Sequence, residues 1–379
     1  MTTQAKDLED TYFWLRLLLT PGVGSVKARK LLATFGSPEA IFKQSLPALG
    51  QIISSKQVDA ILTPPPGYEQ ACHQLRNWLD QNPAHHVLPL GHIHYPQKLL
   101  ETLDPPILLF ANGNLDLLRR PALAIVGSRN PTPQGKETAQ DFARSFSRQG
   151  ITIVSGLALG IDGISQQAAI QESGSTIAVL GTGIDRVYPA SHHALTHQIA
   201  QKGLLLSEYP LGTAPTTHNF PKRNRIIAGL SLGTLVVEAT VHSGSLITAK
   251  MAAEMGREVF AIPGSIHSPQ SKGCHWLIKQ GAKLVETAQE IIEELRIPRA
   301  DTGAPEHTSS VTTTENPPNS TTQTILQAIG QGPTSFDAIT QRTGLDAALL
   351  QTELLMLELN QQIARLPGGL FQQLHSDKT

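Results

Sequence analysis

The sequence predicts an α/β protein built on a doubly wound, Rossmann-like parallel sheet, and two observations carry this prediction. Short apolar runs recur along the middle of the chain, and their lack of polar alternation is typical of strands covered on both faces. A helix-like segment separates each run from the next, which is the pattern of repeated β-α units. The seven runs are Ala122–Val126, Ile151–Val154, Thr176–Leu180, Leu204–Ser207, Thr234–Val237, Glu258–Ile262 and Lys283–Val285.

The first of the separating segments has clear helix boundaries. Thr132 is a good N-cap, and Pro133 suits the first helical position. Apolar residues recur between Ala139 and Phe146 at the i, i+3, i+4, i+7 spacing of one buried helix face. Gly150 stands where a C-terminal glycine cap belongs. The alternation of strand and helix is therefore supported by the local chemistry of its first unit.

We expect five parts in the chain, because its composition shifts at four places. Prolines interrupt the chain at Pro64–Pro66 and Pro105–Pro106, and beyond alanine the stretch 298–322 contains a single aliphatic residue, Val311. Such a stretch buries too little apolar surface to offset its ordering entropy. The parts are a helical SAM or helix-hairpin-helix-like domain (1–62), a connecting extension of the core (63–120), the Rossmann-like core (121–297), a flexible linker (298–322) and a winged-helix module (323–379).

Composition limits the class of partner and compartment. Thirty Lys and Arg residues against 31 Asp and Glu residues give a formal net charge of −1. A nucleic-acid site would therefore have to be a local basic groove. The two cysteines fit a reducing compartment, and no apolar run approaches the ~20 residues of a membrane span. We expect a cytoplasmic protein that binds no membrane.

Glycine and serine crowd the loops that follow the predicted strands, where ligands of open α/β sheets bind. They let a ligand approach backbone amides and helix N-termini closely, as phosphate binding requires. The candidate ligand-binding residues of these loops are Gly127, Ser128 and Arg129 after the first strand, Ser155 and Gly156 after the second, Gly181 after the third, and Ser243, Gly244 and Ser245 after the fifth.

The loop after the fourth strand adds positive charge beside an aromatic ring. No Asp or Glu occurs from Tyr209 to Val237, while Lys222, Arg223 and Arg225 fall within four positions. Cations in the first turn of a helix oppose its dipole, and an anionic ligand would resolve that conflict. Phe220 offers a face on which a base could stack, which suits single-stranded nucleic acid. Equally open is a structural role, in which the arginines pair with Glu238 or Asp162 and Phe220 is core.

Other chemistries find little support. The loop after the first strand reads Gly-Ser-Arg-Asn-Pro-Thr and lacks a dinucleotide-binding fingerprint, and in the loop Gly181-Thr182-Gly183 the third glycine is replaced by Arg186. The chain has no P-loop motif. His193 and His197 are four residues apart on a predicted helix, but no carboxylate follows them in a known ligand pattern. We therefore expect no cofactor and no metal. No nucleophile and base stand at a recognisable spacing, and we interpret Glu208, Glu238, Asp162 and Asp185 as groups that brace loops.

The loop motifs, taken in order, resemble the DprA/Smf family of DNA-processing proteins over about residues 122–294. The resemblance rests on Gly127-Ser128-Arg129, Ser155-Gly156-x-Ala158-x-Gly160-Ile161-Asp162, Gly181-Thr182-Gly183-x-Asp185, Tyr188-Pro189, Phe220-Pro221-x-Arg223-Asn224-Arg225 and Ser243-Gly244-Ser245-Leu246-Ile247-Thr248. It implies a dimeric, non-enzymatic protein that binds single-stranded DNA and loads the RecA recombinase during natural transformation. It also implies that Arg129, Lys222, Arg223 and Arg225 line the DNA pocket with Phe220. Lys250, on the helix after the Ser-Gly-Ser loop, is a candidate for a further phosphate contact, and the role of an ordinary solvated lysine is equally open.

The chain also departs from the family pattern. Cys274 and His192-His193 stand where members often carry asparagine, and Thr217 stands where some carry a basic residue. These departures bear on the fine chemistry of the pocket. The alternative function is a nucleotide-binding or nucleotide-hydrolysing enzyme of similar fold. Its typical Pro-Gly-Gly-x-Gly-Thr loop is missing, since the nearest comparable stretch begins Ser231-Leu232-Gly233.

The flanking modules suggest contacts with other molecules. Thr20–Gly24 resembles the turn of a helix-hairpin-helix, although a small helical interaction domain fits slightly better because few cations surround it. In the C-terminal module we expect helices over 325–329 and 336–342, a third one capped by Asp346 that runs to about Leu359, and a hairpin at 367–369. The third helix carries two glutamates and no cation, which favours protein docking over duplex reading.

Overall fold

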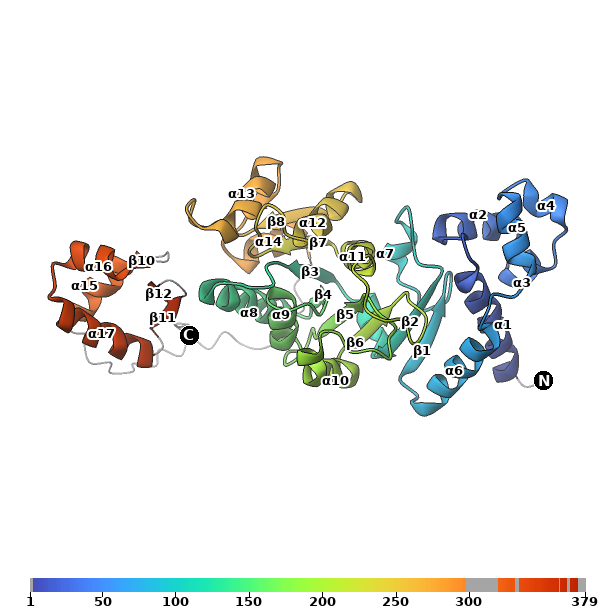
Figure 1. The fold of residues 1–379 in the computed structure, drawn as a ribbon, viewed down its shortest axis with the longest axis horizontal. Helices are drawn as coiled ribbons and strands as arrows, with labels where there is room; N and C mark the ends of the chain where they lie inside the picture. The colour runs from blue at the N-terminus through green and yellow to red at the C-terminus, as the bar shows by residue number, and fades with distance from the viewer. Residues whose placement is uncertain (1–2, 298–319, 331–333, 361, 367–368, 374–379) are drawn as a thin grey trace.

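A computed structural model of the protein describes residues 3–297, 320–330, 334–360, 362–366 and 369–373 (Figure 1). Most of the predicted linker, residues 298–319, lies outside the described residues. Helix α15 (Ser320–Ile329) begins within the last residues assigned to the linker, 320–322. Hydroxyl-bearing residues are favoured at helix starts, where backbone N–H groups lack partners, so a polar composition alone did not mark the boundary.

The core is a sheet of nine strands among the described residues, in the order β1-β2-β6-β5-β4-β3-β7-β8-β9. The strands from β3 to β9 pair in parallel, which confirms the predicted doubly wound sheet. The predicted strands hold to within two residues at either end, and the structure places them as β3 (Ala122–Val126), β4 (Thr152–Ser155), β5 (Thr176–Leu180), β6 (Leu204–Ser207), β7 (Gly233–Val236), β8 (Glu258–Ala261) and β9 (Lys283–Leu284).

Two further strands were not predicted from the sequence. β1 (His85–Pro89) pairs antiparallel with β2 (Leu108–Gly113), which in turn pairs antiparallel with β6. Histidines and a proline in β1, and the prolines before β2, hide the usual apolar signature of a strand. The connecting extension therefore continues the core sheet.

Helices cover both faces of the sheet. Successive side chains of β3 point to opposite faces: Leu123 and Ile125 join one apolar cluster, while Ala122, Ala124 and Val126 join the other. Helices α8 (Pro133–Arg148), α9 (Ile161–Ala169) and α14 (Ala288–Glu294) pack on the first side, and α11 (Asn219–Leu230), α12 (Ser245–Glu254) and α13 (Lys272–Lys279) on the second (Figure 1). Helix α10 (His193–Lys202) follows a short 3-10 turn, Ala190–His192.

The N-terminal helices form a layer at the β1–β2 end of the sheet. Trp14 and Trp78 share one apolar cluster with Phe110 of β2, so this layer packs directly on the extension. Arg29, one of the cations near the glycine-rich turn, donates a 3.0 Å hydrogen bond to the Leu103 carbonyl, which commits it to internal packing. The helices of this layer are α1 (Thr3–Leu19), α2 (Ser25–Phe35), α3 (Pro38–Phe42), α4 (Leu46–Gly50), α5 (Ser55–Leu62) and α6 (Tyr68–Gln81). Helix α7 (Gln97–Leu100), in the extension, packs against α11 instead.

The C-terminal module has its own core and the expected order of elements. Helix α16 (Phe336–Thr343) and helix α17 (Ala347–Leu359) follow α15, and Asp346 caps α17 by accepting a 3.0 Å hydrogen bond from the Ala348 amide. Strands β10 (Thr334–Ser335), β12 (Leu370–Gln373) and β11 (Ile363–Leu366) form a small sheet in that order. None of the helices in the described part of the chain combines the length and apolar character that crossing a membrane requires.

Candidate nucleic-acid interface

A cavity of about 570 Å³ opens at the carboxyl ends of the central strands. The strand order reverses direction between β3 and β7, so the loops after these strands diverge and leave a crevice, which is where open α/β sheets bind ligands. Eight residues predicted as ligand-binding line this cavity: Gly127, Ser128, Arg129, Phe220, Arg223, Ser243, Gly244 and Ser245. The structure thus brings together residues from three segments of the chain, the first of which lies about 90 or more positions before the other two.

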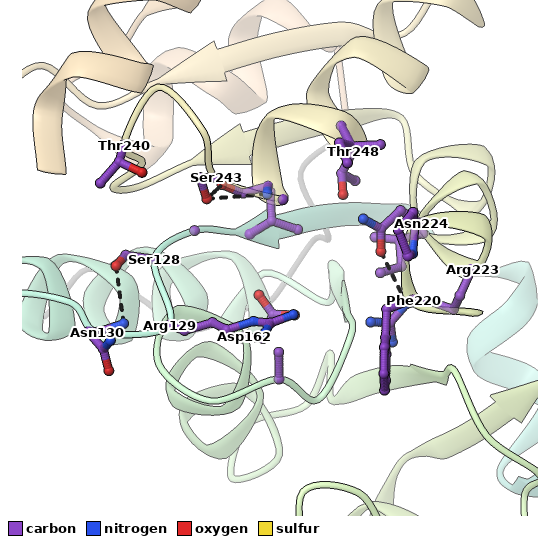
Figure 2. A pocket seen from close by; sticks show the side chains of 18 of the residues that line it. Ser128, Arg129, Asn130, Asp162, Phe220, Arg223, Asn224, Thr240, Ser243 and Thr248 are labelled. Carbon is purple, nitrogen blue, oxygen red and sulfur yellow. Dashed lines mark hydrogen bonds between the residues drawn. The ribbon is translucent and has the colours of Figure 1, made fainter. Parts of the chain in front are cut away.

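Arg129 and Phe220 supply the exposed charge and the aromatic surface of the pocket. The Arg129 side chain is exposed, reaches across the pocket toward the side that Phe220 occupies (Figure 2), and makes no ion pair with the described residues. Phe220 is half-buried, and the ring of Tyr188 lies 5.3 Å from it, centroid to centroid. Sites for single-stranded nucleic acids combine these two features: a cation binds the phosphate, and an aromatic ring stacks on a base.

Arg223 forms the floor of the pocket and is a structural residue as much as a contact. Its Nη1 donates a 2.7 Å hydrogen bond to the Gly156 carbonyl and another to the Val179 carbonyl, and the side chain is buried. Burial, with a smaller contribution from the like charge of Arg129, lowers the pKa of the Arg223 guanidinium to about 10, against the attraction of Asp162. An anion bound above these two arginines would relieve their mutual repulsion.

Three predicted cations lie outside the cavity lining. Arg225 is buried and ion-paired with Glu208, and its Nε lies 3.3 Å from Asp104 Oδ2. The Lys222 ammonium lies 3.7 Å from Glu208, and that of Lys250 lies 3.7 Å from Glu254 on the outer side of α12. Consecutive residues of a helix point about 100° apart, so cations that are neighbours in sequence need not share a face. The predicted pairing of Arg225 with Glu238 or Asp162 is wrong, because Glu208 and Asp104 are its partners.

Ser155, Gly156 and Gly181 also lie outside the lining, but they shape it. The Ser155 hydroxyl donates a 2.6 Å hydrogen bond to the Ile125 carbonyl and ties β4 to β3. A Cβ atom on Gly156 would lie 2.6 Å from Nη2 of Arg223, and one on Gly181 would lie 2.7 Å from the Phe220 ring. Both glycines are therefore required because side chains of the pocket pack against their backbone.

Three helices begin at the pocket, and some of their first N–H groups are bonded within the chain: the Ser245 amide of α12 donates to the Ser243 hydroxyl (3.4 Å) and the Ile161 amide of α9 to the Ser128 carbonyl (3.1 Å). The residues before α9, α11 and α12 are Gly160, His218 and Gly244, and none of them makes a side-chain capping hydrogen bond in the described chain. The first N–H groups of a helix lack partners inside it, and the helix dipole adds partial positive charge there. The pocket is consequently suited to phosphate oxygens.

The carboxylates around the pocket hold its loops together. Glu238 accepts hydrogen bonds from the Thr132 amide (2.9 Å) and hydroxyl (2.6 Å), and burial raises the pKa of its carboxyl. Asp162 accepts a 3.1 Å hydrogen bond from the Gly156 amide, and Asp185 accepts one of 2.8 Å from the Gly212 amide. Glu208 forms an ion pair with Arg225. Each of the four acids that were interpreted as loop braces therefore binds a backbone or side-chain group of another segment.

Several uncharged lining residues were not predicted as ligand contacts. Tyr188, Asn224 and Thr248 belong to the motifs of the family resemblance but were given no role, and Asn130, Thr240 and Gln270 belong to none of those motifs. Of the departures from the family pattern, Thr217 lines the cavity, whereas Cys274 is buried and the His192 ring contacts the Leu157 carbonyl at 3.0 Å. No group of three or more metal-ligating side chains occurs within the described ranges.

Together the sheet, the pocket at its reversal point and the small C-terminal module define a Rossmann-like binding protein with an appended winged helix. The family DNA recombination-mediator protein A matches residues 86–296, and the DprA winged-helix domain matches residues 310–369. The chain belongs to the DNA recombination-mediator protein A family, DprA, whose members are also called Smf.

Relatives and solved structures agree with this assignment. Protein Smf of Escherichia coli is 44% identical over 77% of this chain and 78% of its own length, and Protein Smf of Synechocystis is 35% identical over 95% and 98%. The crystal structure of DprA from Streptococcus pneumoniae superposes with a TM-score of 0.66 at 38% identity, covering 75% of this chain and 97% of that one. A structure of Helicobacter pylori DprA, described for its single-stranded DNA binding mode, gives a TM-score of 0.52 at 33% identity over 56% and 95%.

Proposed function

We propose that this protein binds single-stranded DNA in the pocket at the reversal point of the sheet and passes the strand to the RecA recombinase during recombination of incoming DNA. The observation that carries the proposal is the exposed Arg129, which reaches toward Phe220 and the neighbouring Tyr188 ring in a pocket where three helices begin. Family membership and the Helicobacter pylori relative, whose structure concerns single-stranded DNA binding, support it. In this proposal Arg129 and the helix N-termini hold phosphates, and Phe220 stacks on a base.

The pocket residues are expected to control binding of single strands. In fluorescence anisotropy, labelled oligo-dT should bind more tightly than the matched duplex, and added salt should weaken it. An Arg129→Ala/Phe220→Ala double variant should bind oligo-dT at least tenfold more weakly, since stacking alone contributes about 1–3 kcal/mol per base. Arg223 is not substituted in this experiment, because it is buried and its loss could lower the stability of the fold as well as the affinity for DNA. Equal affinity for duplex, or a folded double variant with unchanged affinity, would contradict the proposal; Lys43→Ala on the N-terminal layer is the matched control.

We propose also that the protein forms a homodimer through an exposed apolar surface beside the pocket. The surface, here called the Trp276 patch, consists of Val241, Ile247, Ile266, Trp276 and Leu284, which are all substantially exposed. It borders β9, the edge strand of the sheet, whose free backbone groups are open to pairing. Contiguous apolar surface of this kind marks protein interaction sites.

If the Trp276 patch forms the dimer interface, a charge placed in it should change the oligomeric state in solution. A Trp276→Glu variant should sediment as a monomer at concentrations where the wild type is dimeric, because burial of a charge opposes pairing. Leu103→Glu is the control, since Leu103 is highly exposed but lies on the connecting extension. If the Trp276→Glu variant remains dimeric, the dimer uses another surface.

A further inference from the structure

Helix α17 of the winged-helix module exposes a large apolar face. Leu350, Leu354 and Leu357 are buried in the core of the module. On the outer side, Leu349, Leu355, Met356 and Leu359, here called the α17 face, are between 46% and 69% exposed. Exposed apolar side chains gathered on one side of a helix mark an interaction surface, so this face is expected to be covered in one functional state.

The charges around the α17 face select the kind of surface that can cover it. The helix carries Glu353 and Glu358 and no cation. The two cations among the described residues of the module are engaged inside it: Arg342 donates a 2.7 Å hydrogen bond to the Ala328 carbonyl, and Arg365 lies 5.9 Å from the centre of the Phe371 ring. An acidic rim repels phosphates and anionic lipids, and it favours an apolar surface with a basic rim.

The Trp276 patch of the core has this complementary chemistry. On α13, Lys272 and Lys279 are exposed one heptad apart, and Trp276 lies between them on the same face. Neither lysine forms an ion pair with any residue that the structure describes. The patch therefore offers an exposed aromatic ring framed by two cations, where the α17 face offers aliphatic side chains beside two carboxylates.

The chain between the two surfaces is long enough to join them. The patch residue Leu284 lies shortly before α14, where the described core ends, and 22 residues (298–319) separate the core from α15. Fully extended, they span about 75 Å, more than twice the roughly 30 Å diameter of a small domain. These 22 residues include one aliphatic side chain beyond alanine, Val311, so they lack the apolar residues needed to cover either surface themselves.

We propose that the α17 face docks on the Trp276 patch of the same chain, with Glu353 and Glu358 toward Lys272 and Lys279, and thereby competes with pairing of two chains. The winged helix then acts as an internal cap that must leave before the homodimer forms. The docking stands on its own observations, whereas the competition rests on the homodimer proposed above. The docked state also borders the pocket, because Ser243 and Ile247 line both the pocket and the surface next to Trp276.

Trp276 itself reports on the proposed contact. The protein has three tryptophans, and Trp14 and Trp78 are buried, so acrylamide quenching of the full chain reads mainly Trp276. At concentrations where sedimentation shows monomers, a Leu355→Asp/Met356→Asp variant should be quenched about twice as strongly as the wild type or as the control Gln341→Asp on α16. The same variant should dimerise at least tenfold more tightly, since each chain no longer has to release its cap.

Charge exchange tests the orientation of the contact. Glu353→Lys/Glu358→Lys and Lys272→Glu/Lys279→Glu should each raise quenching of the monomer, and their combination should restore the protection of the wild type. Equal quenching of wild type and Leu355→Asp/Met356→Asp overturns the proposal, as does a failure of the combined variant to restore protection. If Trp276 becomes protected from quenching only as the protein concentration rises, and to the same extent in all α17 variants, the patch is covered by a second copy of the chain and not by α17. Anisotropy with oligo-dT on the same samples tests the DNA-binding proposal separately.

Discussion

Replacing Arg225 by methionine should lower the free energy of unfolding by about 3–5 kcal/mol, the usual cost of removing one partner of a buried ion pair. The substitution leaves Glu208, which is almost fully buried, without its partner, and it leaves Asp104 close to that charge. Burial already raises the pKa of the Glu208 carboxyl, and Arg225 is the main group that opposes this rise. Urea unfolding of the two proteins measures the difference.

Two further variants separate the ion pair from the simple loss of an arginine. Arg76→Met removes an exposed arginine, 3.9 Å from Asp80 on the next helical turn, and should change stability by no more than about 0.5 kcal/mol. Adding Glu208→Gln to Arg225→Met should recover part of the loss, because the unpaired charge is removed. If Arg225→Met costs no more than Arg76→Met, the buried pair contributes little to the fold.

A Gly181→Ala variant is expected to weaken binding of oligo-dT about tenfold while the protein stays folded. The new methyl group would lie 2.7 Å from Cδ1 of Phe220, so the ring must move away from its position beside Tyr188. Loss of one stacked base corresponds to about 1–3 kcal/mol, and each 1.4 kcal/mol is a factor of ten in affinity. Fluorescence anisotropy with the oligonucleotide used above gives the affinity.

The effect of Gly181→Ala should depend on the ring. In a Phe220→Ala background the same substitution should have almost no further effect, because the atoms that it displaces are gone. Gly50→Ala, at a glycine with open space around its Cβ position, is the control and should leave binding unchanged. A Gly181→Ala effect that persists without Phe220 would mean that the loop, and not the ring, carries the loss.

The sequence predicted the core sheet well because its strands are apolar on both faces and are separated by amphipathic helices. β1 was missed because proline and histidine mask it and an antiparallel edge strand need not be apolar throughout. β2 lies inside the sheet and is apolar and buried over Leu108–Ala111, but this run comes just after two prolines and was assigned to the connecting region. Local patterns thus specify the buried centre of the sheet better than its extension.

The candidate site was predicted in part, for reasons that the geometry makes plain. The loops of Arg129 and of Ser243–Ser245 meet because the carboxyl ends of parallel strands share one edge of the sheet. For Lys222, Arg223 and Arg225, clustering in the sequence gave no information on direction, and the helix turns two of the three away from the pocket. The polar residues Asn130 and Gln270, which also line the pocket, carry no charge and belong to no motif that would have identified them.

The bond between Thr132 and Glu238 also bears on when a newly made chain acquires its site. The two residues are 106 positions apart, and the pocket needs the loops on both sides of that interval. At a synthesis rate of about 5–20 residues per second, about 5–20 s pass between the emergence of the first loop and that of the second. A nascent chain therefore exposes Arg129 well before it can form the pocket, and a single strand nearby would find a complete site only once the second half of the sheet has left the ribosome.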